Sequence, residues 1–312
     1  MRKSFALVFN DRAGVARPRL LDGVLSGLRA GGAEIFQVPT RSAEEATERV
    51  AALAAGRGAD AVIAAGGDGT FRAVATGASG YQLPIGFVPL GTGNVLAYEI
   101  GIRKRAADLA RGLLANPVIP VQGGLVNGAP FFLMVGAGFD ADIVHGLNYR
   151  TKRLLGRAAY SGPVTKTLLR GPAAFDVDVD GRTFEASWVI VSRASHYGGS
   201  FVLTRDAQLG GNRMVAVIIE GRTRASLLAA STALALGRLA KPETRPRGVT
   251  VIPATRVIIG QRVAIQIEID GDEGGMSPVE VVSSGPTVQL IVPPAYVADV
   301  MNRHTNHVGS DQ

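Results

Sequence analysis

Short apolar runs and helix-like segments alternate through the first third of the sequence, and this alternation constrains the fold more than any other feature. The runs Ser4 to Phe9, Glu34 to Val38, Ala59 to Ala65 and Pro84 to Val88 have the length and composition of buried strands. Segments with helical spacing of apolar residues stand between them. Strands that alternate with helices over short links form a parallel sheet covered by helices on both faces. We therefore expect an α/β domain here.

The pattern changes after Asn116 and Pro117, where strand-like segments become dense. The run Ala264 to Ile269 alternates apolar and polar side chains, which is typical of an antiparallel sheet with one face in water. A length of 312 residues agrees with two domains. The sequence contains no Cys, which excludes a disulfide scaffold, a thiolate metal site and a Cys nucleophile.

The positive charge of the chain is concentrated in two blocks. The formal net charge is +7, and the blocks His145 to Arg170 and Gly221 to Arg247 each contain six basic residues, with one acid, Glu243, in the second. Such blocks indicate an anionic partner, either a lipid surface or nucleic acid. Aromatic residues do not interleave with the basic ones, which argues against nucleic acid. A solvated arginine-rich surface remains the alternative.

Membrane-spanning and secretory segments are not predicted. The N-terminal apolar run ends at Asn10, and the longest mostly apolar stretch, Ala225 to Ala240, is interrupted by polar residues. Both fall short of the ~20 apolar residues that a spanning helix needs. We expect a cytoplasmic protein that is peripheral at the inner face of the membrane.

The strongest chemical signal is the pentapeptide Gly66-Gly67-Asp68-Gly69-Thr70, between a strand and a helix. Glycines there allow a sharp bend and bring backbone N–H groups close to an anion, and the start of the helix adds its positive end. Thr70 can cap the helix or donate to a phosphate. Asp68 can orient a ligand hydroxyl or hold Mg²⁺, or can simply cap a helix.

A second glycine turn, Pro89 to Asn94, also follows a strand and opens a helix. Ligands of open α/β sheets bind outside the carboxyl ends of the strands, so the two turns predict one binding crevice. The chain lacks the G-x-x-x-x-G-K-[ST] pattern of P-loop enzymes. The segment Gly136 to Ala141 fits a dinucleotide fingerprint but lacks the surrounding strand–helix–strand unit.

A third signal is the acidic turn Asp270 to Gly275, at the end of a strand. A carboxylate on a tight turn can act as a base near a substrate hydroxyl. An ordinary acidic hairpin turn is the alternative.

Together these segments resemble the diacylglycerol kinase catalytic-domain superfamily of lipid kinases, over nearly the whole chain. The GGDGT signature is complete, as is the family's Gly-x-Gly-Phe-Asp-Ala segment at Gly136 to Ala141. Tyr197-Gly198-Gly199 matches a Tyr-Gly-Gly segment, and Asp270-Gly271-Asp272 stands where the family has Asp-Gly-Glu. The family's N-terminal turn keeps Asn10 and Gly14 but not its Pro, and Val95 replaces the usual acid after Asn94.

The resemblance implies two domains. The first is an N-terminal parallel-sheet nucleotide domain, residues 1–117, completed by a returning C-terminal segment, 293–312, with Tyr296 to Arg303 as the return. The second is an antiparallel β-rich sandwich domain, residues 118–292, that binds the lipid. The implied reaction transfers the γ-phosphoryl group of ATP to a lipid hydroxyl, with Mg²⁺ arriving with ATP.

The resemblance also implies site residues. The catalytic candidates are Asp272 or Asp270 as the base, together with Asp68. The nucleotide-binding candidates are Asn10, Thr40, Gly66, Gly67, Asp68, Gly69, Thr70, Phe71, Arg72, Gly91, Thr92 and Asn94.

One departure concerns a metal. The family commonly has an Asp-Asp-Gly-Leu segment in which an acid of some bacterial members helps to hold a structural Mg²⁺, but here Gly210 and Gly211 replace both acids. An NAD kinase, which shares the GGDGT signature, and a relative that binds nucleotide or lipid without catalysis remain alternatives. The acceptor (diacylglycerol, sphingoid base, ceramide or phosphatidylglycerol) and the formation of a homodimer also remain open.

Overall fold

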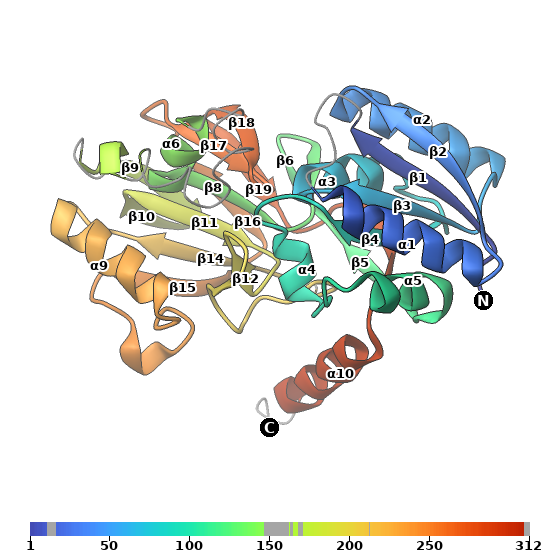
Figure 1. The fold of residues 1–312 in the computed structure, drawn as a ribbon. Helices are drawn as coiled ribbons and strands as arrows, with labels where there is room; N and C mark the ends of the chain where they lie inside the picture. The colour runs from blue at the N-terminus through green and yellow to red at the C-terminus, as the bar shows by residue number, and fades with distance from the viewer. Residues whose placement is uncertain (11–16, 147–161, 163–164, 168–170, 212, 309–312) are drawn as a thin grey trace. The chain divides into compact units, whose positions relative to one another are not determined.

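A computed structural model describes residues 1–10, 17–146, 162, 165–167, 171–211 and 213–308. The chain divides into two compact units. Unit 1 contains Met1–Val121 and Thr287–Gln312, and unit 2 contains Gln122–Pro286. Figure 1 labels their helices and strands.

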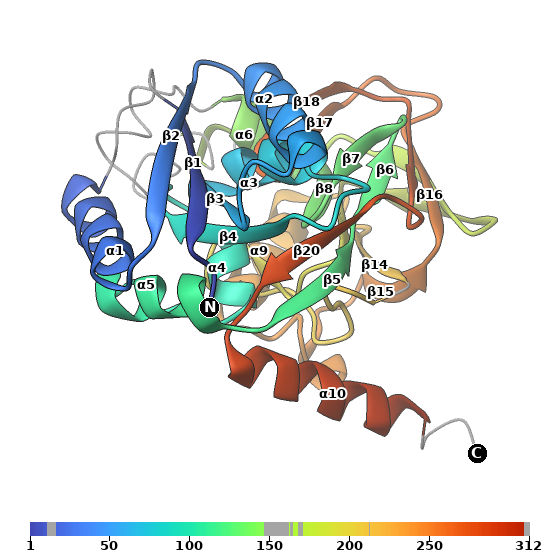
Figure 2. The same cartoon turned by 90° about the vertical axis from the view of Figure 1, so that its right-hand side faces the viewer.

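Unit 1 is built on a sheet with the strand order β2-β1-β3-β4-β20-β5. The pairings β1–β2, β1–β3, β3–β4 and β4–β20 are all parallel. Figure 2 shows β20, from the end of the chain, between β4 and β5. The strands are β1 (Ser4–Asn10), β2 (Glu34–Thr40), β3 (Ala61–Gly66), β4 (Pro84–Pro89), β5 (Val118–Gln122) and β20 (Thr287–Ile291).

Helices cover both faces of this sheet, because its strands carry apolar side chains on both. Phe5, Leu7 and Ile63 on one face belong to a buried cluster with the apolar sides of α1 and α5. Helices α2 and α3 pack together on the other face (Figure 2), where Gly77 lies against Thr47 and Val50. The helices are α1 (Pro18–Ala30), α2 (Ala43–Gly56), α3 (Asp68–Gly77), α4 (Val95–Glu99), α5 (Ala106–Ala115) and α10 (Pro294–Val308).

Unit 2 is an antiparallel β-sandwich. One sheet has the order β10-β9-β16-β19-β6-β7 and the other β15-β14-β11-β8-β17-β18, with a separate β12–β13 pair. The strands are β6 (Gly124–Val126), β7 (Ala129–Phe131), β8 (Met134–Gly138), β9 (Phe175–Val179), β10 (Arg182–Ala186), β11 (Trp188–Ser192), β12 (His196–Tyr197), β13 (Phe201–Val202), β14 (Met214–Ile219), β15 (Val249–Ala254), β16 (Arg256–Ile259), β17 (Gln266–Ile269), β18 (Asp272–Met276) and β19 (Val279–Val282).

The core of unit 2 lies between its two sheets. Val177, Val257 and Val281 from one sheet and Val189 and Ala216 from the other belong to one buried cluster. The helices described in this unit are α6 (Phe139–His145), α9 (Arg224–Ala235) and a 3₁₀ turn at Pro242–Thr244. The α/β domain followed by an antiparallel sandwich confirms the expected fold class.

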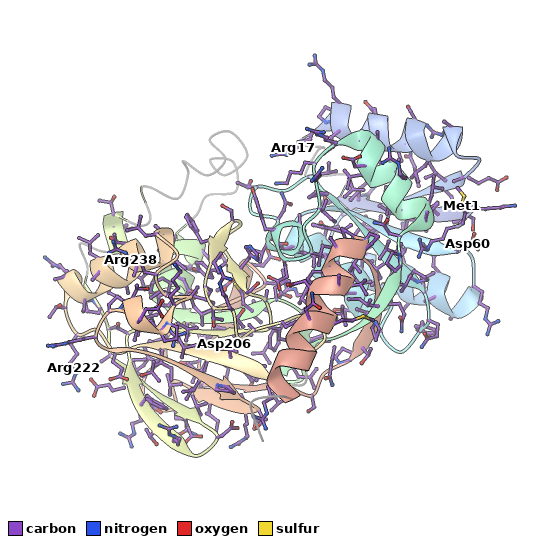
Figure 3. All side chains as sticks on the ribbon, turned by 90° about the horizontal axis from the view of Figure 1, so that it is seen from below. Met1, Arg17, Asp60, Asp206, Arg222 and Arg238 are labelled. Carbon is purple, nitrogen blue, oxygen red and sulfur yellow. The ribbon has the colours of Figure 1, made fainter. Side chains whose placement is uncertain are left out.

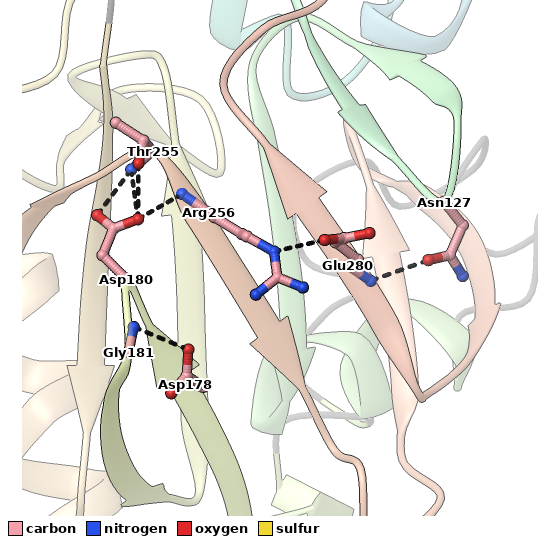
Figure 4. A network of polar contacts seen from close by, with 7 residues as sticks. All are labelled: Asn127, Asp178, Asp180, Gly181, Thr255, Arg256 and Glu280. Atoms are coloured by element: carbon pink, nitrogen blue, oxygen red, sulfur yellow. Dashed lines mark hydrogen bonds and ion pairs between the residues drawn. The ribbon is translucent and has the colours of Figure 1, made fainter.

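A polar network joins four strands of the first sandwich sheet on its outer side (Figure 4). The carboxylate of Asp180 accepts hydrogen bonds from the backbone N–H groups of Thr255 and Arg256, at 3.0 and 2.8 Å. Arg256 Nε then contacts Glu280, whose N–H donates to Asn127 Oδ1 at 2.9 Å. These bonds fix the register from β9 through β16 and β19 to β6.

The unit boundaries lie a few residues from the expected ones at 117 and 293. Val118–Gln122 and Thr287–Ile291 are strands of the first sheet, so the chain returns to unit 1 through β20 and not first at Tyr296. No helix of the described residues is long and apolar enough to cross a membrane. The basic segment with Arg150, Lys152, Arg153 and Arg157 lies outside the described residues.

Candidate active site

The candidate nucleotide residues of unit 1 gather at the carboxyl edge of its sheet. Asn10 and Thr40 end β1 and β2 and are partners in the strand register, and Gly66 ends β3, which flanks β1 on its other side. Thr40 is buried, and its hydroxyl donates to the carbonyl of Phe9 at 3.1 Å. Parallel strands thus place residues that are far apart in the sequence along one edge.

The two glycine turns of unit 1 are in direct contact. The carbonyl of Gly66 accepts hydrogen bonds from the N–H groups of Leu90 and Gly91, at 2.8 and 3.1 Å. A Cβ on Gly91 would lie 2.7 Å from the Cα of Gly67, a distance that backbone atoms do not allow. Glycine is therefore required for this close approach, which places two sets of backbone N–H groups together.

Asp68 joins the same two turns through its side chain. Its Oδ2 accepts the N–H of Val95 at 2.9 Å, and its Oδ1 accepts the N–H of Leu96 at 3.1 Å. Asp68 therefore caps α4, the helix that follows the second turn. Helix α3 begins at Asp68, with Gly67 as its N-cap, so Thr70 lies inside the first turn and does not cap this helix, contrary to one of the two roles expected for it.

The other candidates of unit 1 differ in accessibility. Phe71 is buried and packs edge-to-face on Phe87, with ring centroids 6.0 Å apart. It therefore anchors the Gly66–Thr70 turn in the core. Asn94 is buried with a positive φ of 53°, and its Nδ2 donates to the carbonyl of Gly91. The partly accessible candidates are Asn10, Gly66, Gly67, Asp68, Gly69, Thr70, Arg72, Gly91 and Thr92.

The acidic turn of unit 2 is a tight hairpin between β17 and β18. Asp270 and Gly271 have φ values of 51° and 85°, and Ile269 pairs with Asp272. Positive φ at both central residues favours an Asp-Gly sequence in a two-residue hairpin. The Asp-Gly pair is therefore explained by backbone geometry, independently of any catalytic role.

The two aspartates of this turn have different surroundings. Asp270 is buried, and its carboxylate accepts three backbone N–H groups, from Phe132 at 3.0 Å, Leu133 at 2.8 Å and Met134 at 2.9 Å. It anchors the hairpin to β8. Asp272 is exposed at the start of β18.

Sequence reasoning missed two buried acids beside this turn, Asp140 and Glu268. Burial raises the pKa of Asp140 to about 7, and burial together with the charge of Asp140 raises the pKa of Glu268 well above its ordinary value. The alternation along Ala264 to Ile269 predicts a solvated position for Glu268. Helix α6 packs over β8 and β17 and covers that face.

Aromatic residues surround the first of these acids. The hydroxyl of Tyr197, from the Tyr-Gly-Gly segment, lies 3.3 Å from Asp140 Oδ2. The Tyr197 ring packs on Trp188, and Trp188 packs on Phe139, with centroids 6.2 and 5.2 Å apart. The Gly-Phe-Asp-Ala segment could have signalled this site, because it places Asp140 at the start of a helix directly after a strand.

The residues around Gly211 do not fit a structural Mg²⁺. Gly210 and Gly211 offer no carboxylate, and the guanidinium of Arg193 occupies the position beside them. Its Nη2 donates to the carbonyl of Gly211 at 2.6 Å and its Nη1 to the carbonyl of Ser283 at 2.9 Å. Burial lowers the pKa of Arg193 to about 10, so it is charged at neutral pH and repels a metal ion. The described residues contain no group of three or more His, Asp or Glu side chains placed to hold one.

We expect chelation of divalent metal to leave the thermal stability of the protein unchanged, because Arg193 supplies the positive charge internally. Arg193→Met, which leaves the carbonyls of Gly211 and Ser283 without this donor, should lower Tm by several degrees. Differential scanning fluorimetry with EDTA and with added Mg²⁺ checks both effects. A Tm that falls in EDTA and recovers with Mg²⁺ would contradict the expectation.

Two family models match most of this chain. Residues 4–126 match the family model "Diacylglycerol kinase catalytic domain", and residues 133–295 match "YegS C-terminal NAD kinase beta sandwich-like domain". The chain is 28% identical over 277 residues to a diacylglycerol kinase of Bacillus subtilis, covering 86% of this chain and 89% of that protein. It is 32% identical over 152 residues to a probable lipid kinase YegS-like of Pseudomonas aeruginosa, covering 44% of this chain and 50% of that one.

A crystal structure of a diacylglycerol kinase from Bacillus anthracis has a similar fold. The TM-score is 0.67 at 17% sequence identity, and the superposition covers 94% of this chain and 98% of the other. At this identity the likeness concerns the fold alone.

Proposed function

Because the chain belongs to the family that joins a diacylglycerol kinase catalytic domain to a YegS-type C-terminal domain, we propose that this lipid kinase transfers the γ-phosphoryl group of ATP to the hydroxyl of diacylglycerol. The observation that carries the proposal is the hydrogen bonding between the Gly66–Thr70 turn and the segment that begins with the Gly91–Asn94 turn. The Gly66 carbonyl and the Asp68 carboxylate accept these bonds.

The proposed nucleotide site lies at this double turn. Backbone N–H groups at the start of α3 would donate hydrogen bonds to phosphate oxygens, since the first N–H groups of a helix have no partner within it. Arg72, on the first turns of α3, would add a positive charge, and Asn10 and Thr40 would line the site along the same sheet edge. Mg²⁺ would arrive with ATP and neutralise phosphate charge.

The proposed base is Asp272. A lipid hydroxyl is too weak an acid to ionise at neutral pH, so a carboxylate must accept its proton during transfer. Asp272 is exposed and Asp270 is engaged by three backbone N–H groups, which supports Asp272 as the base and Asp270 as its anchor. Phosphoryl transfer otherwise depends on positioning and charge stabilisation.

A panel of acceptors tests this function directly. The purified chain would be incubated with labelled ATP, Mg²⁺ and, in turn, diacylglycerol, a sphingoid base, ceramide, phosphatidylglycerol and NAD. Selective phosphorylation of diacylglycerol, which the name of the Bacillus subtilis relative supports, is the expected result. Label on NAD would favour an NAD kinase, and ATP binding without transfer to any acceptor would favour a non-catalytic relative.

We also propose that helix α9 docks this unit on an anionic membrane surface. Apart from Arg224 and Thr232, the exposed residues of the helix are apolar. Leu228 is 55% exposed and Leu236, directly after the helix, is 61% exposed. Arg224 is the sole charged residue within α9 itself. A helix whose outer face is mostly apolar is normally covered by another surface, and here the exposed leucines would enter the headgroup layer.

Basic side chains flank this apolar side. Arg222 and Arg224 precede it and Arg238, Lys241 and Arg247 follow it, all exposed; Figure 3 marks Arg222 and Arg238. Glu243 is the one acid between Gly221 and Arg247. Apolar residues with basic residues at both ends match an anionic lipid surface better than an acidic or neutral protein surface.

Replacing Arg224, Arg238 and Lys241 by Gln should weaken binding to anionic vesicles by on the order of 10²-fold, since each basic residue near such a surface contributes roughly 1 kcal/mol. Co-sedimentation with phosphatidylcholine vesicles containing increasing phosphatidylserine measures this effect. Binding by the wild type should rise with phosphatidylserine and fall with salt.

A matched variant removes the same charge elsewhere. Arg17, Arg19 and Arg29 lie exposed on or next to α1 of unit 1, and their triple replacement by Gln should leave vesicle binding near wild type. Equal losses of vesicle binding in both variants would mean that binding depends on the total charge of the protein and not on α9. Salt-independent binding, or self-association through Leu228 and Leu236, would overturn the assignment of α9 to the membrane.

A further inference from the structure

Two buried carboxyl side chains, Asp140 on α6 and Glu268 on β17, face each other in unit 2. Asp140 is 2% exposed and Glu268 is 3% exposed. Gly136 lies between them: a Cβ on this glycine would collide with Asp140 Oδ2 and would lie 2.8 Å from the Cγ of Glu268. The absence of a side chain at position 136 allows two acids to occupy one small volume.

Each carboxyl group has its own hydrogen-bond donors. Asp140 accepts the N–H of Ala141 at 2.7 Å and the hydroxyl of Tyr197 at 3.3 Å. Glu268 Oε2 accepts the N–H of Gly271 at 2.8 Å. None of the ion pairs formed within the described part of the chain involves either acid. Two ionised carboxylates buried together without a cation are strongly unfavourable.

The titration of the pair follows from this arrangement. Burial raises the pKa of Asp140 to about 7. The pKa of Glu268 is also raised, mainly by burial and secondly by the charge of Asp140. Groups in strong mutual contact titrate as a unit. The other titratable groups on the elements packed against the pair are Asp142 and His145 on α6, His196 and Tyr197 on β12, and Asp270, Asp272 and Glu273 on the β17–β18 hairpin.

We propose that Asp140 and Glu268 share one proton at neutral pH, and that Glu268 is a positioning residue for the turn that carries Asp272. The second part rests on the proposed function, in which Asp272 is the base. Glu268 holds the N–H of Gly271, the residue directly before Asp272. Loss of the shared proton places two negative charges on either side of Gly136, and their repulsion moves Glu268, Gly271 and Asp272 together.

Thermal unfolding without nucleotide or lipid tests the shared proton. A carboxyl whose pKa is raised by folding keeps its proton between about pH 4 and pH 7 in the folded chain but not in the unfolded chain. Stability therefore falls as pH rises through that window. The Tm of Asp140→Asn, relative to wild type, should rise by about 5 °C between pH 5 and pH 8. Asp108→Asn, on α5 of unit 1, should show no such trend, and a constant offset for Asp140→Asn would overturn the shared proton.

Two variants of Glu268 test its positioning role. Glu268→Leu removes the acceptor of the Gly271 N–H and should lower kcat about 10- to 100-fold with an unchanged KM for ATP. Glu268→Gln keeps an acceptor without the charge, so it should restore kcat to near wild type at pH 7. It should also remove the decline in kcat that the wild type shows when the pair loses its proton at alkaline pH.

The outcomes separate this inference from the function on which it rests. The positioning role would be overturned if Glu268→Gln had as low a kcat as Glu268→Leu. It would also be overturned if both Glu268→Gln and Asp140→Asn kept the decline of kcat at alkaline pH. A wild-type chain that phosphorylates no lipid would overturn the proposed function. The unfolding experiment uses no substrate, so it still decides whether the two acids share a proton.

Discussion

Asp272→Asn should lower kcat for lipid phosphorylation by about 10²- to 10⁴-fold, the range typical of a general base. The amide has nearly the shape of the carboxylate but cannot accept the hydroxyl proton. The KM for ATP should change little, because the proposed nucleotide residues all belong to unit 1. Steady-state kinetics with saturating diacylglycerol and varied ATP separate the two parameters. Asp272→Glu keeps a carboxylate and matches the family's residue at this position, so it should retain most of the activity.

Neighbouring acids provide matched controls for this prediction. Glu273 is exposed and lies 3.6 Å from His145, and Glu273→Gln should leave kcat near wild type. Asp270→Asn places an NH₂ group against the backbone N–H groups of Phe132, Leu133 and Met134, so its main effect should be a lower Tm. If Asp270→Asn keeps its Tm but loses turnover, while Asp272→Asn stays active, the roles of base and anchor are reversed.

Asp68→Ala should reduce kcat/KM for ATP by on the order of 10²-fold or more. The change leaves the N–H groups of Val95 and Leu96 without their acceptor, so the second glycine turn loses its side-chain connection to the first. Misplacement by about 1 Å of groups that position a reacting phosphate can cost this much. Isothermal titration with ATP and initial rates at varied ATP measure binding and turnover separately.

Asp60, directly before β3, also accepts two backbone N–H groups, but it lies at the amino ends of the strands, opposite the proposed nucleotide residues. Its Oδ2 accepts the backbone N–H groups of Lys3 and Ser4 at 2.7 and 3.1 Å, and Figure 3 labels it in unit 1. Asp60→Ala should cost stability through two lost hydrogen bonds but leave kcat/KM for ATP near wild type. Parallel losses of activity in both variants would mean that Asp68 serves the stability of unit 1 and not the nucleotide site.

The fold of unit 1 could be predicted well, because the residues that indicate its strands and turns are close together in the sequence. Glycine turns directly after short apolar runs indicated the carboxyl ends of β3 and β4, and the register places those turns side by side. The contact of Gly67 with Gly91 and the bonds of Asp68 to α4 join segments over twenty residues apart. Neither segment alone contains a signal for such a contact.

The acids of unit 2 show why other parts were not predictable. Period-two alternation placed Glu268 on a wet face, but α6 covers that face, and alternation along one strand cannot reveal a helix packed from elsewhere. Likewise, the loss of acids at Gly210 and Gly211 was visible in the sequence, whereas the replacement charge comes from Arg193, which ends up beside them only through the fold.

The position of β20 has a consequence for how the protein is made on the ribosome. Strand β4 pairs with β3 and β20, and β5 neighbours β20 alone, so the first 121 residues emerge with an open edge at β4 and no partner for β5. All of unit 2 must be translated before β20 follows, which takes roughly 10 to 30 s at typical elongation rates. Unpaired strand edges promote aggregation, so nascent chains that stall within unit 2 should depend on chaperones more than the finished protein does.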